Sequence, residues 1–381
     1  MADIDAVVVG AGAVGLAIGR ALALAGQSVV VLERHRGIGE EVSSRNSEVV
    51  HAGLYYPTGS LKAKLCAPGA HALYGYCASR GVTANRMGKI VVAPTTAELA
   101  GLEKLAAQAH ANGVEGIELI DPDQVRRLEP DVKVAGAILS PVSGIFDSHS
   151  YMLALLGEIE DQGGALARKA PFEGASHGPD GWTVRTGGDE PATITATRLV
   201  LAPGLAASEA AARVEGLDPA LIPVTRYARG NYFRYAGKAP FRRLVYPMPS
   251  TGGLGIHVTP DLAGHARFGP DVQPVETLDY RVDVGRRSLF AESIRAYWPR
   301  LDESLLEPDY AGIRPKIGNA LKGFEDFRVD GPPQHGLEGL WCLFGIDSPG
   351  LTCSLVLGEH VAGLVTGCWR PEAPEVRWPA M

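Results

Sequence analysis

The chain opens on an apolar run that enters a glycine-rich turn, Val7-Val8-Val9-Gly10-Ala11-Gly12-Ala13-Val14-Gly15. The apolar residues before the turn predict a buried central strand over 6–9. Gly10 permits a tight turn, Gly12 allows a pyrophosphate to approach the backbone, and Gly15 lets the following helix pack close to the strand. A strand, a turn without side chains and a helix in this order are typical of a dinucleotide-binding βαβ unit.

The segment after the turn completes that unit. A helix is predicted over 14–24, with free N–H groups and a partial positive charge directed at phosphates, and Gly26 ends it. A second β-rich run over 28–32 leads to Glu33, whose carboxylate can accept hydrogen bonds from ribose hydroxyls and disfavours a 2′-phosphate. The motif predicts a bound dinucleotide and does not by itself choose between FAD and NAD.

Length and composition describe an ordinary globular protein. The 381 residues suffice for two domains, and the hydrophobic fraction of 46% and the charged fraction of 21% are typical. The formal net charge of −7 argues against a nucleic-acid-binding protein, which usually has a basic face. The five cysteines include no C-x-x-C pair, and no cluster of His, Cys, Asp and Glu has metal-ligand spacing, so we expect reduced thiols and no metal site.

The N-terminus and the hydropathy bear on location. Asp3 and Asp5 precede the first strand, where a signal peptide would carry basic residues. The sequence has no apolar run of about eighteen residues, the length that spans a bilayer. We expect a cytoplasmic protein, and peripheral contact with the inner face of a membrane stays open.

A segment rich in hydroxyl and amide side chains follows the fingerprint, Ser43-Ser44-Arg45-Asn46-Ser47-Glu48-Val49-Val50-His51. Such a segment could wrap a polar cofactor, with hydroxyls and backbone amides on phosphates and a ribityl chain. The alternative interpretation is a capped helix start followed by a hairpin, in which Ser43 or Ser44 is the cap.

Periodicity predicts alternating helices and strands along the rest of the chain. Helices are expected over 61–80 with an interruption at Pro68 and Gly69, over 97–112, 121–128 and 291–297, over 148–161 with Ser148 as the cap, and over 351–364. Strands are expected over 89–94, 136–146, 165–172, 182–185, 192–197, 198–202, 310–315 and 339–344, and an antiparallel group over 224–275.

Three parts of the sequence together resemble one family: the first βαβ unit, the hydroxyl-rich segment, and the late turn Gly345-Ile346-Asp347-Ser348-Pro349-Gly350-Leu351-Thr352. Over nearly its whole length the chain resembles the D-amino-acid-oxidase-like FAD-dependent oxidoreductases. Within that family, the segments 44–57, 59–63 and 311–315 resemble the L-2-hydroxyglutarate dehydrogenase/oxidase group.

The predicted fold is α/β. A Rossmann-type FAD-binding domain of the glutathione-reductase and D-amino-acid-oxidase kind would be assembled from residues 1–85, 147–222 and 336–381. An inserted substrate domain with a mixed antiparallel sheet would comprise residues 86–146 and 223–335. The flavin would lie where the two domains meet.

The resemblance implies FAD as the cofactor. The pyrophosphate and the adenosine would be held by Gly10, Gly12, Ala13, Val14, Gly15, Glu33, Arg34, Phe172 and Gly204. The flavin would be lined by Ser44, Arg45, Asn46 and Ser47, and at its pyrimidine end by Gly345, Ser348, Gly350, Leu351 and Thr352. A helix beginning near Gly350 would direct its N-terminal N–H groups at flavin N1/C2=O, where negative charge collects on reduction.

The resemblance also implies oxidation of an L-2-hydroxy acid, foremost L-2-hydroxyglutarate to 2-oxoglutarate, by hydride transfer to flavin N5. The protein must then supply a base and a carboxylate clamp. His51 is our candidate base, because an ordinary imidazole pKa near ~6.5 suits proton transfer at neutral pH. Its alternatives are a structural histidine beside the cofactor and a histidine that tethers FAD covalently. Arg314 is our candidate clamp, since its planar fork suits bidentate binding, and its alternative is a buried ion pair.

A dicarboxylate substrate needs a second anchor, for which the candidate donors are Tyr55, Tyr56, Lys64, Tyr246 and His257; we place Tyr246 and His257 in the catalytic site. The same fold also hosts amine oxidases of the glycine- or sarcosine-oxidase kind. A flavin-binding protein without activity is a second alternative, and a NAD-dependent dehydrogenase a weaker third. Oxygen, a quinone or another flavoprotein could accept the electrons.

Overall fold

The computed structural model describes residues 2–248, 255–318 and 323–367, and its first sheet is built around the fingerprint strand. β1 (Ile4–Val9) lies between β12 and β2 and pairs with both in parallel. Its last four residues are buried, as expected of a strand covered on both faces. The sheet runs in the order β10 (Phe172–Gly178), β11 (Gly181–Thr186), β12 (Ala192–Leu201), β1, β2 (Val29–Leu32) and β9 (Ala165–Ala167), and β20 (Leu340–Phe344) pairs with β12 and with β19 (Arg328–Asp330).

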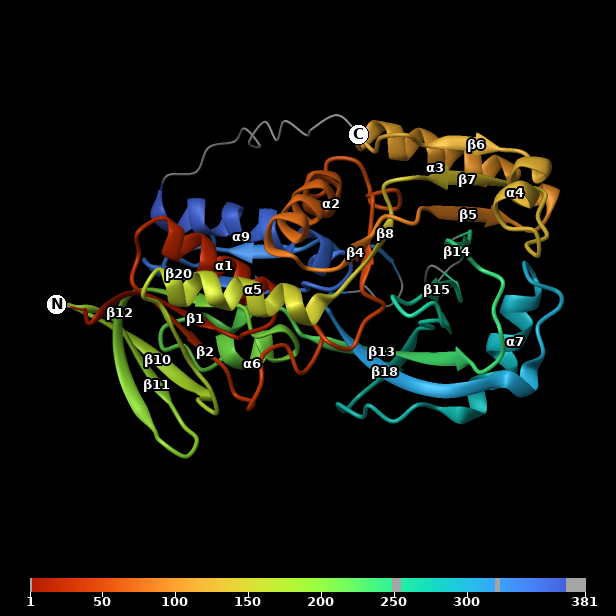
Figure 1. Cartoon of the computed structure of the whole chain (residues 1–381). Coiled ribbons are helices and arrows are strands. Elements are labelled where there is room, and N and C mark those ends of the chain that lie inside the picture. The colour runs from red at the N-terminus through yellow and green to blue at the C-terminus, as the bar shows by residue number, and fades with distance from the viewer. Residues whose placement is uncertain (1, 249–254, 319–322, 368–381) are drawn as a thin grey trace.

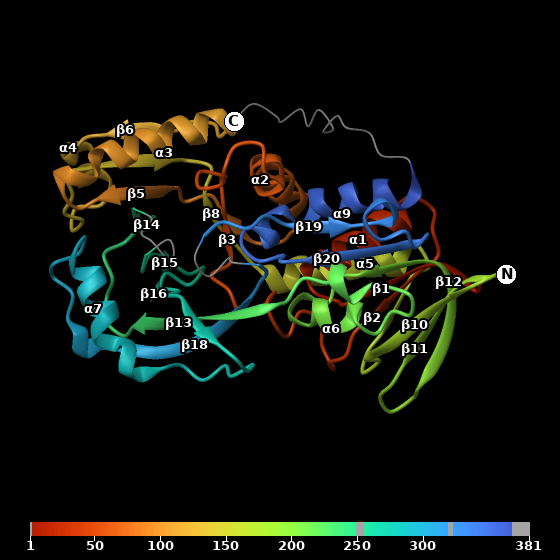
Figure 2. The same ribbon diagram turned by 180° about the vertical axis from the view of Figure 1, so that it is seen from behind.

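Helices cover both faces of this sheet (Figures 1 and 2). On one face α1 (Ala13–Leu24) packs against α9 (Gly350–Thr366) and α5 (Ser148–Asp161), and α2 (Leu61–Arg80) packs against α9. The contact between α1 and α9 is close: a Cβ on Gly358 would lie 2.6 Å from the carbonyl carbon of Ala17. The short helix α6 (Ala207–Ala211) packs on the opposite face. The helices predicted over 14–24 and 351–364 are confirmed.

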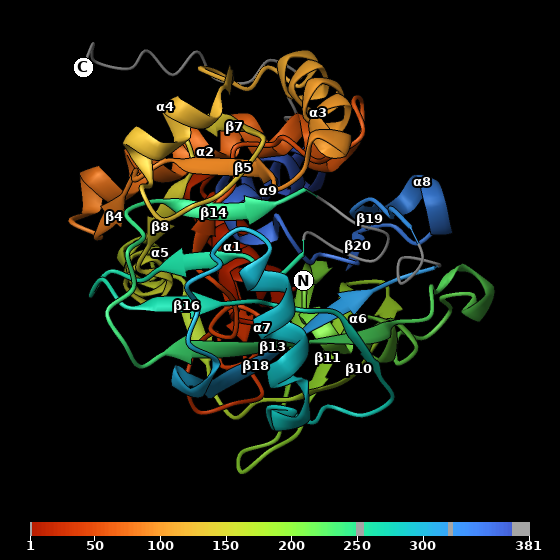
Figure 3. The ribbon, with the colours of Figure 1, turned by 90° about the vertical axis from the view of Figure 1, so that its right-hand side faces the viewer.

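A second sheet extends beside the first and carries α7 (Arg287–Arg295) on one face (Figure 3). Phe290 of α7 packs with Ile90 and Val92, whereas Val91 of the same strand belongs to the core shared with the helices of the first sheet. This alternation matters for the site, because it directs Lys89 toward the first domain. The sheet runs in the order β17 (Gln273–Val275), β13 (Arg226–Tyr235), β16 (Ala266–Phe268), β15 (Val258–Pro260), β14 (Leu244–Pro247), β5 (Lys89–Ala93), β7 (Gly136–Ser140) and β6 (Glu118–Ile120), and β18 (Leu306–Lys316) pairs with β13.

The remaining elements connect the two sheets or flank them. A small sheet of β3 (Val49–Val50), β8 (Gly144–Phe146) and β4 (Ala84–Asn85) lies where the chain passes between the domains. α4 (Pro122–Leu128) begins as predicted, with Asp121 accepting from the Gln124 amide at 2.8 Å and Pro122 in its first turn. The other helices are α3 (Leu99–Ala111), α8 (Pro332–His335) and the 3₁₀ turns Thr96–Glu98, Gly204–Ala206, Pro219–Leu221, Val284–Arg286 and Glu303–Leu305.

Two predicted helix features are wrong. α2 runs unbroken through Pro68, because the next residue, Gly69, packs against α9: a Cβ on Gly69 would lie 2.9 Å from the carbonyl oxygen of Thr352. The stabilisation from packing α2 against α9 exceeds the cost of the helical hydrogen bond that Pro68 cannot make. α5 is capped by Asp147 and not by Ser148, since the Asp147 carboxylate accepts from the Ser150 amide at 2.9 Å.

Three further boundaries differ from prediction. The strand expected over 165–172 divides into β9 and the start of β10, because Lys169 between them adopts φ +53°. The two strands expected over 192–202 form the single strand β12, whose first half pairs with β11 and second half with β1. The helix expected over 291–297 begins at Arg287 and ends at Arg295.

The predicted domain boundaries stay a prediction, with one observation bearing on them. β19 already pairs with β20 in the first sheet, ahead of the predicted boundary at 336. Residues 368–381 of the predicted first domain, including Cys368, lie outside the described residues; Cys66, Cys77, Cys342 and Cys353 are buried and free. Within the described ranges, no helix has the length and apolar character needed to cross a membrane.

Candidate active site

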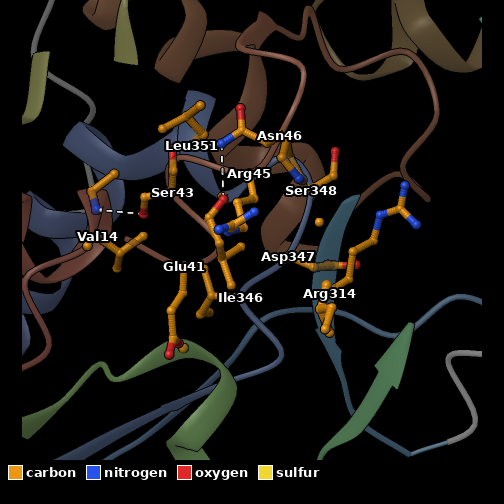
Figure 4. Close-up of a pocket in the computed structure, with 18 of the residues that line it drawn as sticks. Val14, Glu41, Ser43, Arg45, Asn46, Arg314, Ile346, Asp347, Ser348 and Leu351 are labelled. Carbon is orange, nitrogen blue, oxygen red and sulfur yellow. Dashed lines mark hydrogen bonds between the residues drawn. The ribbon is translucent and has the colours of Figure 1, made fainter. Parts of the chain in front are cut away.

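One cavity of about 930 Å³ runs from the fingerprint to the second sheet. Its volume is in the upper range of small-molecule sites, which span roughly 300–1,000 Å³. Figure 4 shows its two ends, with Val14 and Ser43 on one side and Arg314 on the other. A ligand bound along the cavity would touch both domains.

The glycines of the fingerprint line a cradle that side chains would fill. Gly10 has φ +103°, and a Cβ there would lie 2.6 Å from the carbonyl oxygen of Ala202. A Cβ on Gly15 would lie 1.9 Å from the carbonyl oxygen of Gly10, and one on Gly12 would lie 2.9 Å from Oγ of Ser43. The three roles read from the sequence thus have separate steric causes, and the start of α1 opens on the space that they leave.

Glu33 lies at the end of β2, as predicted, and is nearly buried. Its carboxylate accepts from the Ala11 amide at 3.0 Å and from the His35 amide at 2.8 Å. These bonds hold the carboxylate beside the glycine turn, where a ribose would lie. Arg34, Phe172 and Gly204 line the same end of the cavity, although Arg34 also pairs with Glu41.

The hydroxyl-rich segment forms turns, so the alternative of a helix capped by Ser43 or Ser44 is wrong. Ser43 instead accepts from the Ala13 amide at 3.0 Å, at the start of α1. Arg45, Asn46 and Ser47 line the cavity with Ser43. Ser44 lies behind them, donating to the carbonyl of Gly39 at 2.5 Å.

The late turn before α9 faces the middle of the cavity. Ser348, Gly350, Leu351 and Thr352 line it, whereas Gly345 packs against Ile317. Hydrogen bonds fix the helix start to the hydroxyl-rich segment. Thr352 donates to the Val49 carbonyl at 3.2 Å and accepts from the His51 amide at 3.0 Å.

A buried ion pair supports this turn, and the sequence reading missed it. The Asp347 carboxylate lies 2.7 Å from Nζ of Lys62 and 2.5 Å from Nζ of Lys316. Burial acts to raise the pKa of Asp347, but the two ammonium groups outweigh it and the pKa is lowered. Helical spacing from Lys62 to the buried Cys66 could have placed this lysine on an inward face.

His51 lies where the late turn meets the second sheet. Its Nε2 is 3.4 Å from the Ser348 hydroxyl, and its Nδ1 is buried with no hydrogen-bond partner among the described residues. Burial lowers the pKa of His51 well below the ordinary value, and repulsion by Lys89 and His257 in their protonated forms lowers it further. The imidazole is therefore neutral at pH 7 and able to accept a proton.

Tyr246 and His257 form a stacked pair on the opposite wall, with ring centroids 3.7 Å apart. Nδ1 of His257 lies 3.3 Å from the Gly255 carbonyl, which leaves Nε2 as an acceptor in the neutral ring. Burial and the charges of Lys89 and Arg314 lower the pKa of His257 as well. The structure therefore brings His51, Tyr246 and His257 to one end of the cavity.

Arg314 reaches this end from β18. One of its nitrogens donates to the Asp271 carbonyl at 3.2 Å. Across residues 2–248, 255–318 and 323–367, no carboxylate lies within ion-pair distance of its guanidinium. The alternative of a buried ion pair therefore finds no partner in the described chain, and most of the fork is free for a ligand.

Lys89 is the largest omission of the sequence reading. Its side chain is 0% exposed, and within the described chain its Nζ has no hydrogen-bond partner. The ammonium lies over the ring of Tyr246 at 4.1 Å and over that of Tyr55 at 5.6 Å. Burial lowers the pKa of Lys89 to about 7. A signal existed, since period-two alternation puts Lys89 on the same buried face as Val91.

The other predicted anchors for a second carboxylate are Tyr55, Tyr56 and Lys64. Tyr55 and Tyr56 line the cavity, but Lys64 is exposed on α2. Among the described residues, no group of three or more His, Cys, Asp or Glu side chains is placed to hold a metal ion.

Comparison with known proteins agrees with this geometry. The family model described as "FAD dependent oxidoreductase" (DAO) matches residues 5–364. The mitochondrial L-2-hydroxyglutarate dehydrogenase of Arabidopsis thaliana is 41% identical, over 94% of this chain and 83% of that protein. The L-2-hydroxyglutarate dehydrogenase of Escherichia coli (strain K12) is 27% identical, over 95% of this chain and 93% of that protein.

Solved structures share the fold. The dithionite-reduced L-alpha-glycerophosphate oxidase from Mycoplasma pneumoniae with FAD bound has a TM-score of 0.86 and 21% identity, covering 98% of this chain and 97% of that one. Glycine oxidase from Geobacillus kaustophilus has a TM-score of 0.78 and 22% identity, covering 96% and 95%. The predicted α/β architecture with two kinds of sheet is thereby confirmed.

The residues present fit FAD. The glycine cradle leaves room for a pyrophosphate at the start of α1, Glu33 stands where the ribose follows, and the cavity continues past α9 for a tricyclic ring. The cofactor predicted from the sequence is the one that the family uses. With a family model that spans residues 5–364, the chain belongs to the DAO family of FAD-dependent oxidoreductases.

Proposed function

We propose that this enzyme oxidises an L-2-hydroxy acid, with L-2-hydroxyglutarate as its substrate and 2-oxoglutarate as its product. The observation that carries the proposal is the convergence of a neutral imidazole, His51, and a guanidinium without a carboxylate partner in the described chain, Arg314, on one cavity. These are the two groups that oxidation of a hydroxy acid requires besides the flavin. The plant relative named for this activity, 41% identical, supports the same substrate.

Arg314 would hold the carboxylate next to the reacting carbon. Its guanidinium presents a planar fork, and the bond to the Asp271 carbonyl fixes how that fork is directed. His51 would then accept the hydroxyl proton. Its main-chain amide is tied to Thr352, so the imidazole is held at the start of α9. When bound, FAD would supply the two-electron acceptor for the hydride of the α-carbon.

The remaining residues would hold the cofactor. Gly10, Gly12, Ala13, Val14 and Gly15 would surround the pyrophosphate, with Ser43 bracing the helix start. The first amides of α9, at Gly350 and Leu351, would lie toward the pyrimidine end of the ring, where a helix N-terminus favours negative charge. From the sequence alone we propose a cytoplasmic location, with peripheral membrane contact left open. Oxygen, a quinone and another flavoprotein stay the candidate electron acceptors.

An anaerobic substrate screen tests the proposal. The purified holoenzyme is mixed with L-2-hydroxyglutarate, D-2-hydroxyglutarate, L-lactate, glycine and sarcosine, and the flavin absorbance is followed. We expect bleaching with L-2-hydroxyglutarate and none with the two amino acids. Bleaching by glycine or sarcosine alone would assign the amine-oxidase alternative, and a spectrum unchanged by all five would contradict the proposal. Flavin that stays with the protein after denaturation would identify a covalent tether.

A further inference from the structure

The end of the cavity beyond His51 contains polar side chains that have no role in the proposed reaction. Tyr55 and Tyr246 line it, and their Oη atoms are buried without a hydrogen-bond partner among the described residues. Buried polar atoms are rarely left unpaired in a native protein. Two phenol hydroxyls facing one cavity therefore indicate a ligand group that accepts hydrogen bonds at this place.

Lys89 can supply a positive charge at this end. Lys89 lies behind the two tyrosines, with its ammonium 4.1 Å from the Tyr246 ring centroid. Among the residues that the structure describes, no carboxylate pairs with Nζ, although a buried charge normally has a partner. The group missing from this arrangement is an anion that accepts hydrogen bonds.

The two tyrosines have the right chemistry for a carboxylate. A phenol hydroxyl without a partner can donate to it, and the ammonium lies on the far side of the same rings. Arg314 is separate from them on β18 and is assigned to the first carboxylate. A ligand with two carboxylates would satisfy both ends of the cavity.

We propose that Lys89 is the positioning residue for the second carboxylate of a dicarboxylate substrate. The hydroxyls of Tyr55 and Tyr246 would donate hydrogen bonds to this carboxylate, and the Lys89 ammonium behind their rings would supply the opposite charge. This inference rests on the proposed oxidation of a hydroxy acid and names the feature that selects its substrate. Monocarboxylates of the same length would leave Lys89 without a counter-charge, so the enzyme would discriminate against them.

Binding of non-reacting acids tests the inference without turnover. Glutarate has two carboxylates and pentanoate has one on a chain of the same length, and neither has a hydroxyl to oxidise. By calorimetry on the holoenzyme, we expect Lys89→Met to weaken glutarate about 30-fold, as loss of a buried charge partner does, and to change pentanoate less than about 3-fold. Lys104→Met, which removes an exposed lysine on α3, should change neither.

Proton uptake gives a second readout that a structural role would not produce. The free Lys89 has a pKa of about 7 and is mostly neutral at pH 8, and a bound carboxylate would favour its charged form. Glutarate binding at pH 8 should therefore take up a proton in the wild type and take up less in Lys89→Met, measured from the buffer dependence of the binding enthalpy. Among the described residues, the other titratable groups near Nζ are His51, Tyr55, Cys66, Tyr246 and His257.

Equal losses for glutarate and pentanoate, or no loss for either, would overturn the inference. Tyr246→Phe covers the case in which Lys89→Met does not fold, because it removes only a hydroxyl, which lies beside the Thr259 hydroxyl and has no hydrogen bond of full geometry in the described chain. It should weaken glutarate about 15-fold, the value of one hydrogen bond to a charged group, and an unchanged affinity would count against the inference. The two proposals can fail separately. If the enzyme oxidised no hydroxy acid but its binding of glutarate still depended on Lys89, the proposed function would fail and this inference would stand.

Discussion

The two ends of the cavity are built on different principles. At the nucleotide end, the groups that would touch the cofactor are mainly backbone, and their positions follow from glycines and a helix start. The polar side chains there already have partners: Glu33 accepts from two amides, and Ser43 accepts from Ala13. This end is fixed before a ligand arrives.

At the reaction end the same cavity is lined by side chains that lack partners in the described part of the chain. His51 Nδ1, Tyr55 Oη, Tyr246 Oη and His257 Nε2 are buried there, and Lys89 lies behind them. Such groups cost stability when unpaired. Their arrangement is favourable only when a polar ligand completes it, which is what a substrate site needs and a structural core does not.

Because the two ends are built differently, we expect them to respond differently to mutation. Variants at the nucleotide end should act on cofactor content, because backbone geometry is lost. Variants at the reaction end should leave FAD bound and act on the substrate, because they remove groups that have no structural task. The four variants below, ordered by the size of the expected effect, separate these responses.

Gly15→Ala should have the largest effect. The added Cβ would lie 1.9 Å from the carbonyl oxygen of Gly10, so either α1 or the turn must move and the phosphate cradle is lost. We expect purified protein without bound FAD and without activity, measured by flavin absorbance after desalting.

Gly157→Ala is the matched control for a glycine in a helix. Nothing lies within 4 Å of the Cβ that it would add in α5, and the change should raise stability by up to about 1 kcal/mol through helix propensity. Full FAD content in Gly15→Ala would show that the cradle reading is mistaken.

This asymmetry also explains what the sequence could predict. The nucleotide end depends on local order in the chain, and its strand, turn, helix and acid stand in one segment of about thirty residues. The fold followed from the same periodicity, apart from features decided by distant packing. α2 is one such feature, since Pro68 is tolerated only because Gly69 meets α9.

The reaction end depends on contacts between segments that are far apart in the chain. His51 and Arg314 could be proposed because family-like motifs carry them. Lys89 carries no motif, and its role depends on Tyr246 from another strand and Tyr55 from a loop. The alternative in which Ser43 caps a local helix failed for a similar reason, because its partner Ala13 lies thirty residues earlier.

His51→Gln should have the next largest effect and should leave FAD in place. Removal of a general base lowers rates by about 100- to 10,000-fold. We expect that fall both in kcat and in the rate constant of flavin reduction by L-2-hydroxyglutarate, the latter measured in single turnover. The flavin content should be unchanged. His149→Gln, at an exposed position on α5, serves as the control. A kcat within about twofold of the wild type would remove His51 as the base and leave His257, whose Nε2 faces the same cavity, as the candidate.

The pH dependence of the wild type sharpens that test. Because the pKa of His51 is lowered, the base of the free enzyme stays unprotonated to well below pH 6.5, and kcat/KM should fall only at still lower pH. Lys89 contributes to this lowering, so Lys89→Met should move the acid limb to higher pH. An acid limb at the same pH in both proteins would contradict the coupling between Lys89 and His51.

Arg314→Lys should have an intermediate effect, confined to the substrate. Lysine keeps the charge and loses the planar fork, so the carboxylate loses bidentate binding. We expect KM for L-2-hydroxyglutarate to rise about 100-fold, the effect of losing a well-placed charged pair, with FAD content unchanged. An unchanged KM would remove Arg314 from the site.

Glu33→Gln should have the smallest effect, and it acts at the opposite end. The amide keeps the size of the carboxylate, but only one of its two terminal atoms can accept a hydrogen bond. It therefore cannot satisfy both the Ala11 and the His35 amides while binding a ribose. We expect the Kd for FAD to rise about 10-fold, in line with one or two lost hydrogen bonds to a charged group, and KM for the substrate to stay unchanged in protein saturated with FAD. Glu190→Gln on an exposed turn is the control. The opposite result would be a change in KM with the affinity for FAD intact. A carboxylate held by the Ala11 and His35 amides at the nucleotide end would then act on the substrate. The division of the cavity into a prearranged nucleotide end and an unsatisfied reaction end would fail.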